Sequence, residues 1–182
     1  VFLACQGHFT GAEAAYADAS RTGADIVHPN EPPKWANLMS QARCTLNQVF
    51  AHNIVFFADP DTLLVGDFLG LEQARLATTV VSLPGQMMFS GDRLAQLKPE
   101  RMRLLQQALP VCDVRPLDLY PNFEMLPVWD LKVRRPFGEW DVVALFNWTE
   151  KEAPVGFDFA ELGLDPNAEY ALDEFWTQTF QG

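Results

Sequence analysis

The sequence predicts an α/β protein in two parts, a partial β/α barrel followed by an antiparallel β domain. The first observation is an apolar run, residues 54–57, that leads into two carboxylates around a proline, Asp59 and Asp61. Short apolar runs are typical of strands buried on both faces, and α/β barrels keep their chemistry at the carboxyl ends of such strands. The second observation is an alternation of such runs with helix-like stretches, which indicates parallel βαβ units. The third is a series of strand-like runs from about residue 114 onward.

In chain order, we expect a strand at residues 1–5, a helix rich in Ala and Glu at 11–19, and a short strand at 24–27. Pro33, at a typical first helical position, opens a long amphipathic helix over 34–52. The apolar residues of that helix keep helical spacing: Trp35, Leu38, Met39, Leu46, Val49 and Phe50.

After the strand at 54–57, the stretch 69–83 is ambiguous. Residues 78–81 favour a strand by propensity, whereas residues 71–76 favour a helix. We predict one buried helix, which Pro84 and the glycine after it bring to an end.

The first part then ends with a strand at 86–89 and a helix from Pro99 to Pro110, with Met102, Leu104, Leu105 and Leu109 on its inner side. The second part is expected to contain strands at 128–133, 140–148, 155–159 and 170–176. Residues 161–167 form a turn cluster.

Composition excludes several classes of protein. The chain has 182 residues, 48% of them hydrophobic and 12% aromatic, which argues for a packed core and against disorder. A formal charge of −11 without a basic cluster argues against a nucleic-acid partner. No apolar run approaches the roughly 20 residues of a membrane span, so we expect no membrane partner.

Three widely spaced cysteines, Cys5, Cys44 and Cys112, form neither a disulfide framework nor a zinc pattern. We therefore expect no metal site and a reducing, cytoplasmic location. Residues 1–5 begin within a strand-like run without an initiator Met, and residues 179–182 end just after another. We expect the chain to be a fragment of a longer protein.

Polar residues lie at the ends of four of the expected strands, and parallel strands of a barrel deliver such positions to one common face. These residues are Cys5 with Gln6, Arg21 with Asp25, Asp59 with Asp61, and Ser90 with Asp92. Spacing alone leaves their role open, because Asp after an apolar run is also a common turn or helix-cap residue.

Two segments carry a more specific resemblance. Residues 21–26 (RTGADI) and 57–66 (FADPDTLLVG) resemble the last half of the barrel in the α-galactosidases (melibiases) of glycoside hydrolase families 27 and 36. Those enzymes carry an arginine ahead of an A-D pair and, one strand later, a W-N-D-P-D-x-L segment. Residues 90–94 (SGDRL) are similar to the family's S-N-D-L or S-D-D-L segment, and residues 142–148 look like its terminal β-sandwich.

The resemblance implies the C-terminal half of a (β/α)8 barrel over residues 1–112, followed by an antiparallel β-sandwich domain over 113–182. It implies the following roles: Asp25 as general acid/base; Arg21, Gln6, Asp61 and Cys5 at the bound sugar; and Asp59 and Asp92 as structural support. The chain departs from the family pattern at Phe57, Ala58 and Gln6.

The parent protein is then expected to cleave α-galactosides with retention, through a covalent glycosyl-enzyme and without a cofactor. The family carries its nucleophile in a K-x-D segment one strand earlier, and nothing in residues 1–24 resembles that segment. We therefore expect no turnover by the chain alone. Expected partners are an α-galactoside or oligosaccharide, and either the missing N-terminal half of the barrel or a second copy. Two alternatives remain: transfer of the galactosyl unit to another sugar, and a non-catalytic carbohydrate-binding or structural module.

Plainer interpretations stand beside these. Arg21 and Asp25 are four residues apart and could form a surface ion pair on a helix, and residues 59–61 could be an ordinary turn. His28 could line the rim of the site or lie in a solvated loop. The tryptophans of the second part could stack on a sugar, but their alternating β patterns favour the core of a sandwich: Trp129, Trp140, Trp148 and Trp176.

Overall fold

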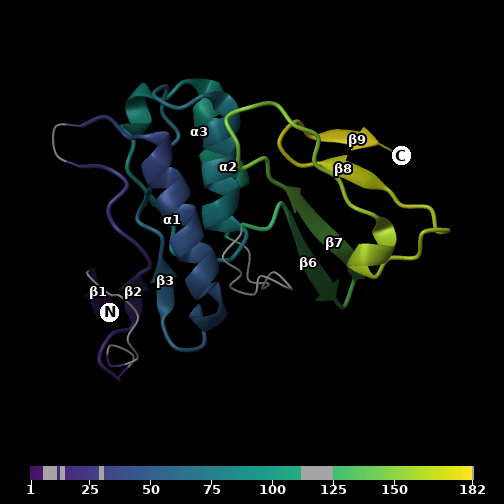
Figure 1. Ribbon diagram of the computed structural model, residues 1–182, viewed down its shortest axis with the longest axis horizontal. Helices are drawn as coiled ribbons and strands as arrows, with labels where there is room; N and C mark the ends of the chain where they lie inside the picture. The colour runs from purple at the N-terminus through teal and green to yellow at the C-terminus, as the bar shows by residue number, and fades with distance from the viewer. Residues whose placement is uncertain (6–11, 13–14, 29–30, 112–124, 182) are drawn as a thin grey trace.

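The computed structural model describes residues 1–5, 12, 15–28, 31–111 and 125–181. In these residues the chain forms three α-helices and small separate β-sheets of two or three strands. The three helices lie side by side in the middle of the molecule, with the first strands on one side and two C-terminal hairpins on the other (Figure 1). The domain boundary expected at residue 112 or 113 lies outside the described residues.

The N-terminal strands pair in parallel, as the alternation of strands and helices predicted. β1 (Leu3–Ala4), β2 (Ala19–Arg21) and β3 (Phe57–Asp59) form one sheet in the order β1-β2-β3. β4 (Thr62–Leu63) and β5 (Phe89–Ser90) form a second parallel pair.

The expected half of a (β/α)8 barrel is nevertheless wrong, because the described strands form no continuous barrel wall. The interruption falls between β3 and β4. Pro60 has no amide hydrogen to donate to a neighbouring strand, and Asp61 has a φ of +72°, in the left-handed region. These two residues turn the chain, so β4 pairs with β5 in a sheet of its own.

The expected β-sandwich is also wrong. β6 (Val128–Arg135) and β7 (Gly138–Leu145) form one antiparallel hairpin, and β8 (Leu172–Glu174) and β9 (Thr179–Gln181) form another. Trp129 of the first hairpin, together with Phe146 just after it, packs against α1 and α2. The molecule is therefore a small mixed α/β structure.

Three of the four helices expected from the sequence are confirmed. They are α1 (Trp35–Gln48), which continues in a 3-10 turn at Val49–Ala51, α2 (Leu71–Ser82) and α3 (Pro99–Gln107). Pro99 occupies the first position of α3, where its missing amide hydrogen costs nothing. One detail differs: Leu109 lies beyond α3 and is 57% exposed, so it is not an inner residue of that helix.

The expected strands at 24–27 and 54–57 are displaced. Residues 24–27 lie in the loop after β2, and the strand expected at 54–57 begins only at Phe57, after a turn in which Ile54 is 66% exposed. Large apolar residues in the sequence indicated the wrong strand positions, because the buried positions of these strands hold small residues. Ala19 at the start of β2 and Ala58 at the centre of β3 are fully buried.

Three further expectations need correction. The strand expected at 86–89 reaches strand pairing only at its last residue, in β5. Residues 155–159 form no strand and lead into a 3-10 turn at Phe159–Leu162. The helix expected at 11–19 lies partly outside the described residues, and Ala19, its last residue, belongs to β2.

Two hydrophobic clusters hold the helices and strands together. α2 packs against both α1 and α3. The first cluster joins α2 and α3 to the β4 segment and includes Leu63, Val65, Ala74, Ala77 and Leu104. The second joins α1 and α2 to the β6–β7 hairpin and includes Ala42, Leu46, Val80, Trp129 and Phe146.

Trp129 is the anchor of the second cluster. It is fully buried, its ring centroid lies 4.4 Å from that of Phe146, and its indole Nε1–H donates to the Leu126 carbonyl oxygen at 3.1 Å. Trp140, on β7, is 43% exposed, so the prediction that it belongs to a core is wrong. Trp148 and Trp176 pack at the edges of the two clusters.

The helices of the described segments are all too short or too polar to cross a membrane.

Replacing Trp129 with alanine should lower the free energy of unfolding by about 3–5 kcal/mol, the usual cost of removing a large buried aromatic side chain. Trp140→Ala is the matched control and should cost about 1 kcal/mol or less, because that side chain is largely exposed. Denaturant unfolding followed by circular dichroism measures both. Equal losses for the two variants would contradict this account of the core.

Candidate functional site

The register of the first sheet brings an arginine and an aspartate together. In the pairing of β2 with β3, Arg21 lies opposite Asp59. Its Nε–H donates to Asp59 Oδ2 at 2.8 Å. The Asp59 side chain is 1% exposed and that of Arg21 is 14% exposed. A buried carboxylate needs such a partner, because an unpaired charge in the interior is strongly destabilising.

Asp61 joins the same cluster through the turn after β3. Its backbone amide donates to Asp59 Oδ1 at 2.9 Å, which closes the turn around Pro60. Its own carboxylate is 12% exposed, lies 3.2 Å from Arg21 Nη1, and accepts the Ile26 amide at 2.7 Å. The positive φ of Asp61 is rare for a residue with a side chain and is held here by these contacts.

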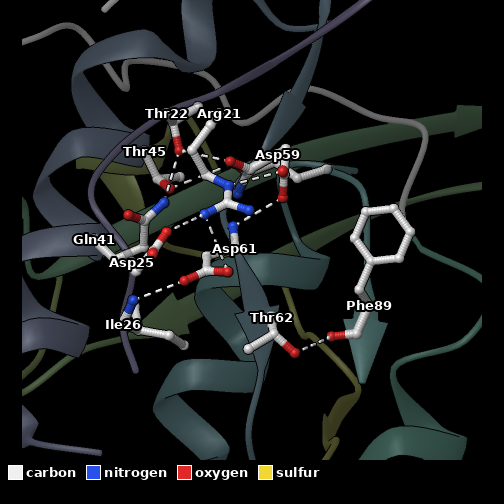
Figure 2. A network of polar contacts seen from close by, with 11 residues as sticks. Arg21, Thr22, Asp25, Ile26, Gln41, Thr45, Asp59, Asp61, Thr62 and Phe89 are labelled. Carbon is white, nitrogen blue, oxygen red and sulfur yellow. Dashed lines mark hydrogen bonds and ion pairs between the residues drawn. The ribbon is translucent and has the colours of Figure 1, made fainter. Parts of the chain in front are cut away.

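Asp25 completes the cluster from the loop after β2. Its Oδ1 accepts from Arg21 Nη1 at 2.9 Å. Figure 2 shows the guanidinium at the centre, with the carboxylates of Asp25, Asp59 and Asp61 around it. The Asp25 side chain is 66% exposed, so it is the member of the cluster that a dissolved molecule reaches most easily.

The charges of the cluster do not balance. One guanidinium faces three carboxylates, a formal charge of −2 when all three are ionised. Burial by itself would lower the pKa of Arg21, but the hydrogen bond and charge of Asp59, with the charges of Asp61 and Cys5, outweigh burial and raise that pKa. The arginine therefore stays a cation and a hydrogen-bond donor throughout the ordinary pH range.

The interpretation of Arg21 and Asp25 as an ion pair on a helix is wrong. Arg21 ends β2, and Asp25 lies in the loop that follows. The interpretation of residues 59–61 as an ordinary turn before a helix is also wrong, because they join β3 to β4 and both of their carboxylates bind Arg21.

Three residues that the sequence analysis passed over support this loop. Thr22 donates its amide to the Asp59 carbonyl oxygen at 2.9 Å and accepts a hydrogen bond from Gln41 Nε2 at 2.8 Å. Gln48 Nε2 donates to the Thr22 carbonyl oxygen at 2.5 Å. A signal existed in the sequence, because Gln41 is a polar residue on the apolar face of α1, where it is only 6% exposed.

The other predicted site residues lie apart from the cluster or outside the description. Gln6 is outside the described residues. Cys5 is exposed after β1. The Asp92 carboxylate accepts hydrogen bonds from the backbone amides of Val65 and Gly66 at 2.7 and 3.1 Å, and these bonds hold the loop before α2. His28 is exposed in the loop beyond Asp25.

Within the described ranges, no group of three or more His, Cys, Asp or Glu side chains has an arrangement that could hold a metal ion. The cluster offers different chemistry. It contains fixed N–H donors on Arg21, buried carboxylate acceptors, and one exposed carboxylate that can exchange a proton. These groups suit the recognition of hydroxyl groups and general acid/base chemistry.

Comparison with models of known protein families and with curated proteins finds no match for this chain.

Replacing Arg21 with methionine should lower the free energy of unfolding by about 3–5 kcal/mol, because it leaves the buried Asp59 carboxylate unpaired. Asp25→Asn removes a partner of the same guanidinium from an exposed position and should cost about 1 kcal/mol or less. Urea unfolding at neutral pH separates the two outcomes. A large loss for Asp25→Asn, or a small one for Arg21→Met, would contradict the division into a buried ion pair and an exposed carboxylate.

Proposed function

We propose that the Arg21 cluster is the sugar-binding and proton-transferring part of a retaining α-galactosidase-like glycoside hydrolase. The observation that carries the proposal is the convergence of Asp25 and Asp61 on one Arg21 nitrogen, at 2.9 and 3.2 Å. These residues belong to the two segments that resemble the family, 21–26 and 57–66. Residues that are far apart in the chain thus bind one guanidinium.

In this proposal Asp25 is the general acid/base. Its Oδ1 is bound to Arg21, which leaves Oδ2 to give a proton to the leaving oxygen and later to take one from water. Two further carboxylates, those of Asp59 and Asp61, bind the same guanidinium. Asp25 is also the exposed member, so it is the one placed to exchange that proton with substrate.

Arg21 and Asp61 bind the sugar in this proposal, and Asp59 supports them from below. The remaining N–H groups of Arg21 and the carboxylate of Asp61 pair with sugar hydroxyl groups, which both donate and accept. The second carboxyl group of a retaining site lies roughly 5–5.5 Å from the acid/base and acts as nucleophile. The proposal assigns that group to a segment other than residues 1–24, where the sequence has no K-x-D pattern.

One observation favours a second candidate, a non-catalytic module. All three carboxylates of the cluster bind the same guanidinium, which is also how a purely structural ion-pair network is built. A structural network needs no ligand, whereas the proposed site must bind a galactose-like molecule.

Binding of deoxygalactonojirimycin to the 182-residue chain distinguishes the two. The protonated ring nitrogen of this iminosugar carries a positive charge, which a cluster with excess carboxylates attracts. Titration followed by NMR should show saturable shifts at Arg21, Asp25 and Ile26. Asp25→Asn should weaken affinity by about tenfold, the equivalent of 1.4 kcal/mol.

Asp67→Asn is the matched control, because Asp67 is a 54% exposed carboxylate paired with Lys98 away from the cluster. Its affinity should stay within about twofold of the unchanged chain. The gluco epimer, deoxynojirimycin, should bind more weakly. Absence of saturable binding, or equal weakening by both Asp→Asn variants, would overturn the proposal in favour of the structural network.

A further inference from the structure

We infer that three side-chain amides of α1 position Asp25, and that Gln41 is the central one of the three. This inference rests on the proposed function of the cluster and adds the residues that set its geometry. The loop over residues 22–26 carries Asp25 away from β2. The position of the carboxylate therefore depends on what fixes this loop.

Three side-chain amides of α1 bind the loop. Asn37 Nδ2 donates to the Ile26 carbonyl oxygen at 3.2 Å. Gln41 and Gln48 donate to the Thr22 hydroxyl and carbonyl oxygens at 2.8 and 2.5 Å. Residues 37, 41 and 48 are separated by one and two helical turns, so their side chains project from one face of the helix.

The same loop residues are bound to the cluster on their other side. The Thr22 amide donates to the Asp59 carbonyl oxygen at 2.9 Å, and the Ile26 amide donates to Asp61 Oδ2 at 2.7 Å. Thr22 and Ile26 thus bridge α1 to the cluster at both ends of the loop. Asp25 lies between these two points, so α1 sets where its carboxylate meets Arg21.

Close approach of the loop to α1 requires a glycine. A Cβ added at Gly23 would lie 2.3 Å from Gln41 Oε1 and 3.1 Å from Cys44 Cβ. Figure 2 shows the Gln41 amide beside Thr22, with Arg21 and Asp25 next to them. Any side chain at position 23 has to displace this amide from its hydrogen bond.

Burial of Gln41 is better explained by positioning than by packing. It lies on the buried side of α1 with Leu38, Ala42 and Leu46. An amide placed there loses its water and is stabilised only by hydrogen bonds in the protein, whereas an apolar side chain carries no such cost. The gain from the amide is the fixed loop.

Gln41→Leu tests the inference, because it keeps the approximate volume of the side chain and removes the donor. Asn47→Leu is the matched control, an amide on the exposed side of the same helix. Two quantities are measured well below the midpoint of thermal unfolding of each variant. They are hydrogen exchange of the Ile26 amide, which reports the bond to Asp61, and affinity for deoxygalactonojirimycin.

Gln41→Leu should speed Ile26 exchange by about tenfold and weaken affinity by about the same factor, whereas Asn47→Leu should change each by less than about twofold. In an Asp25→Asn background, Gln41→Leu should weaken affinity no further, because it acts through Asp25. Additive losses in that background, or unchanged Ile26 exchange, would overturn the inference.

A second pair of variants at Thr22 gives the same test if Gln41→Leu does not fold. Thr22→Ser keeps the hydroxyl that accepts from Gln41 and should preserve Ile26 protection, whereas Thr22→Val removes it and should not. Failure of the chain to bind the iminosugar at all would refute the proposed function. The exchange measurements would still decide the positioning role.

Discussion

The pairing of Arg21 with the buried carboxylate of Asp59 is the constraint on which the rest of the site depends. Parallel register sets these residues opposite each other, and the low exposure of Asp59 makes the pairing obligatory. Once the guanidinium is fixed by its Nε–H, its Nη1 atom can meet only carboxylates that approach from the loops after the two strands. Asp25 and Asp61 do so. The buried pair of Arg21 and Asp59 therefore fixes where the more exposed carboxylates of Asp61 and Asp25 bind.

Exposure then separates the two inner carboxylates from the outer one. The exposed fraction of the side chain rises from 1% at Asp59 to 12% at Asp61 and 66% at Asp25. The inner carboxylate orients the arginine, the middle one ties the loop to the turn after β3, and the outer one faces solvent. A general acid needs this combination, a position fixed by neighbours and a surface open to substrate. The helix amides extend the same support to the loop itself.

The sequence predicted the helices and the convergence of the acidic residues, but not the sheet. The helices followed from apolar spacing and from Pro33 and Pro99, which are local signals. The polar residues at the strand ends suggested a common face, and Arg21 does bring three of them together. The strands could not be located from apolar runs, because their fully buried residues Ala19 and Ala58 are too small to mark them. The prediction of a barrel was wrong because the backbone turns at Pro60 and Asp61, which interrupts the sheet.

The most direct test of this account is the Arg21 Nε–H resonance in an NMR spectrum of the 182-residue chain. A hydrogen bond to a buried carboxylate should make this proton exchange slowly with water and give a correlation across the bond to the Asp59 carboxyl carbon. An Arg21 Nε–H that exchanges as fast as a free arginine side chain, without such a correlation, would contradict the central claim.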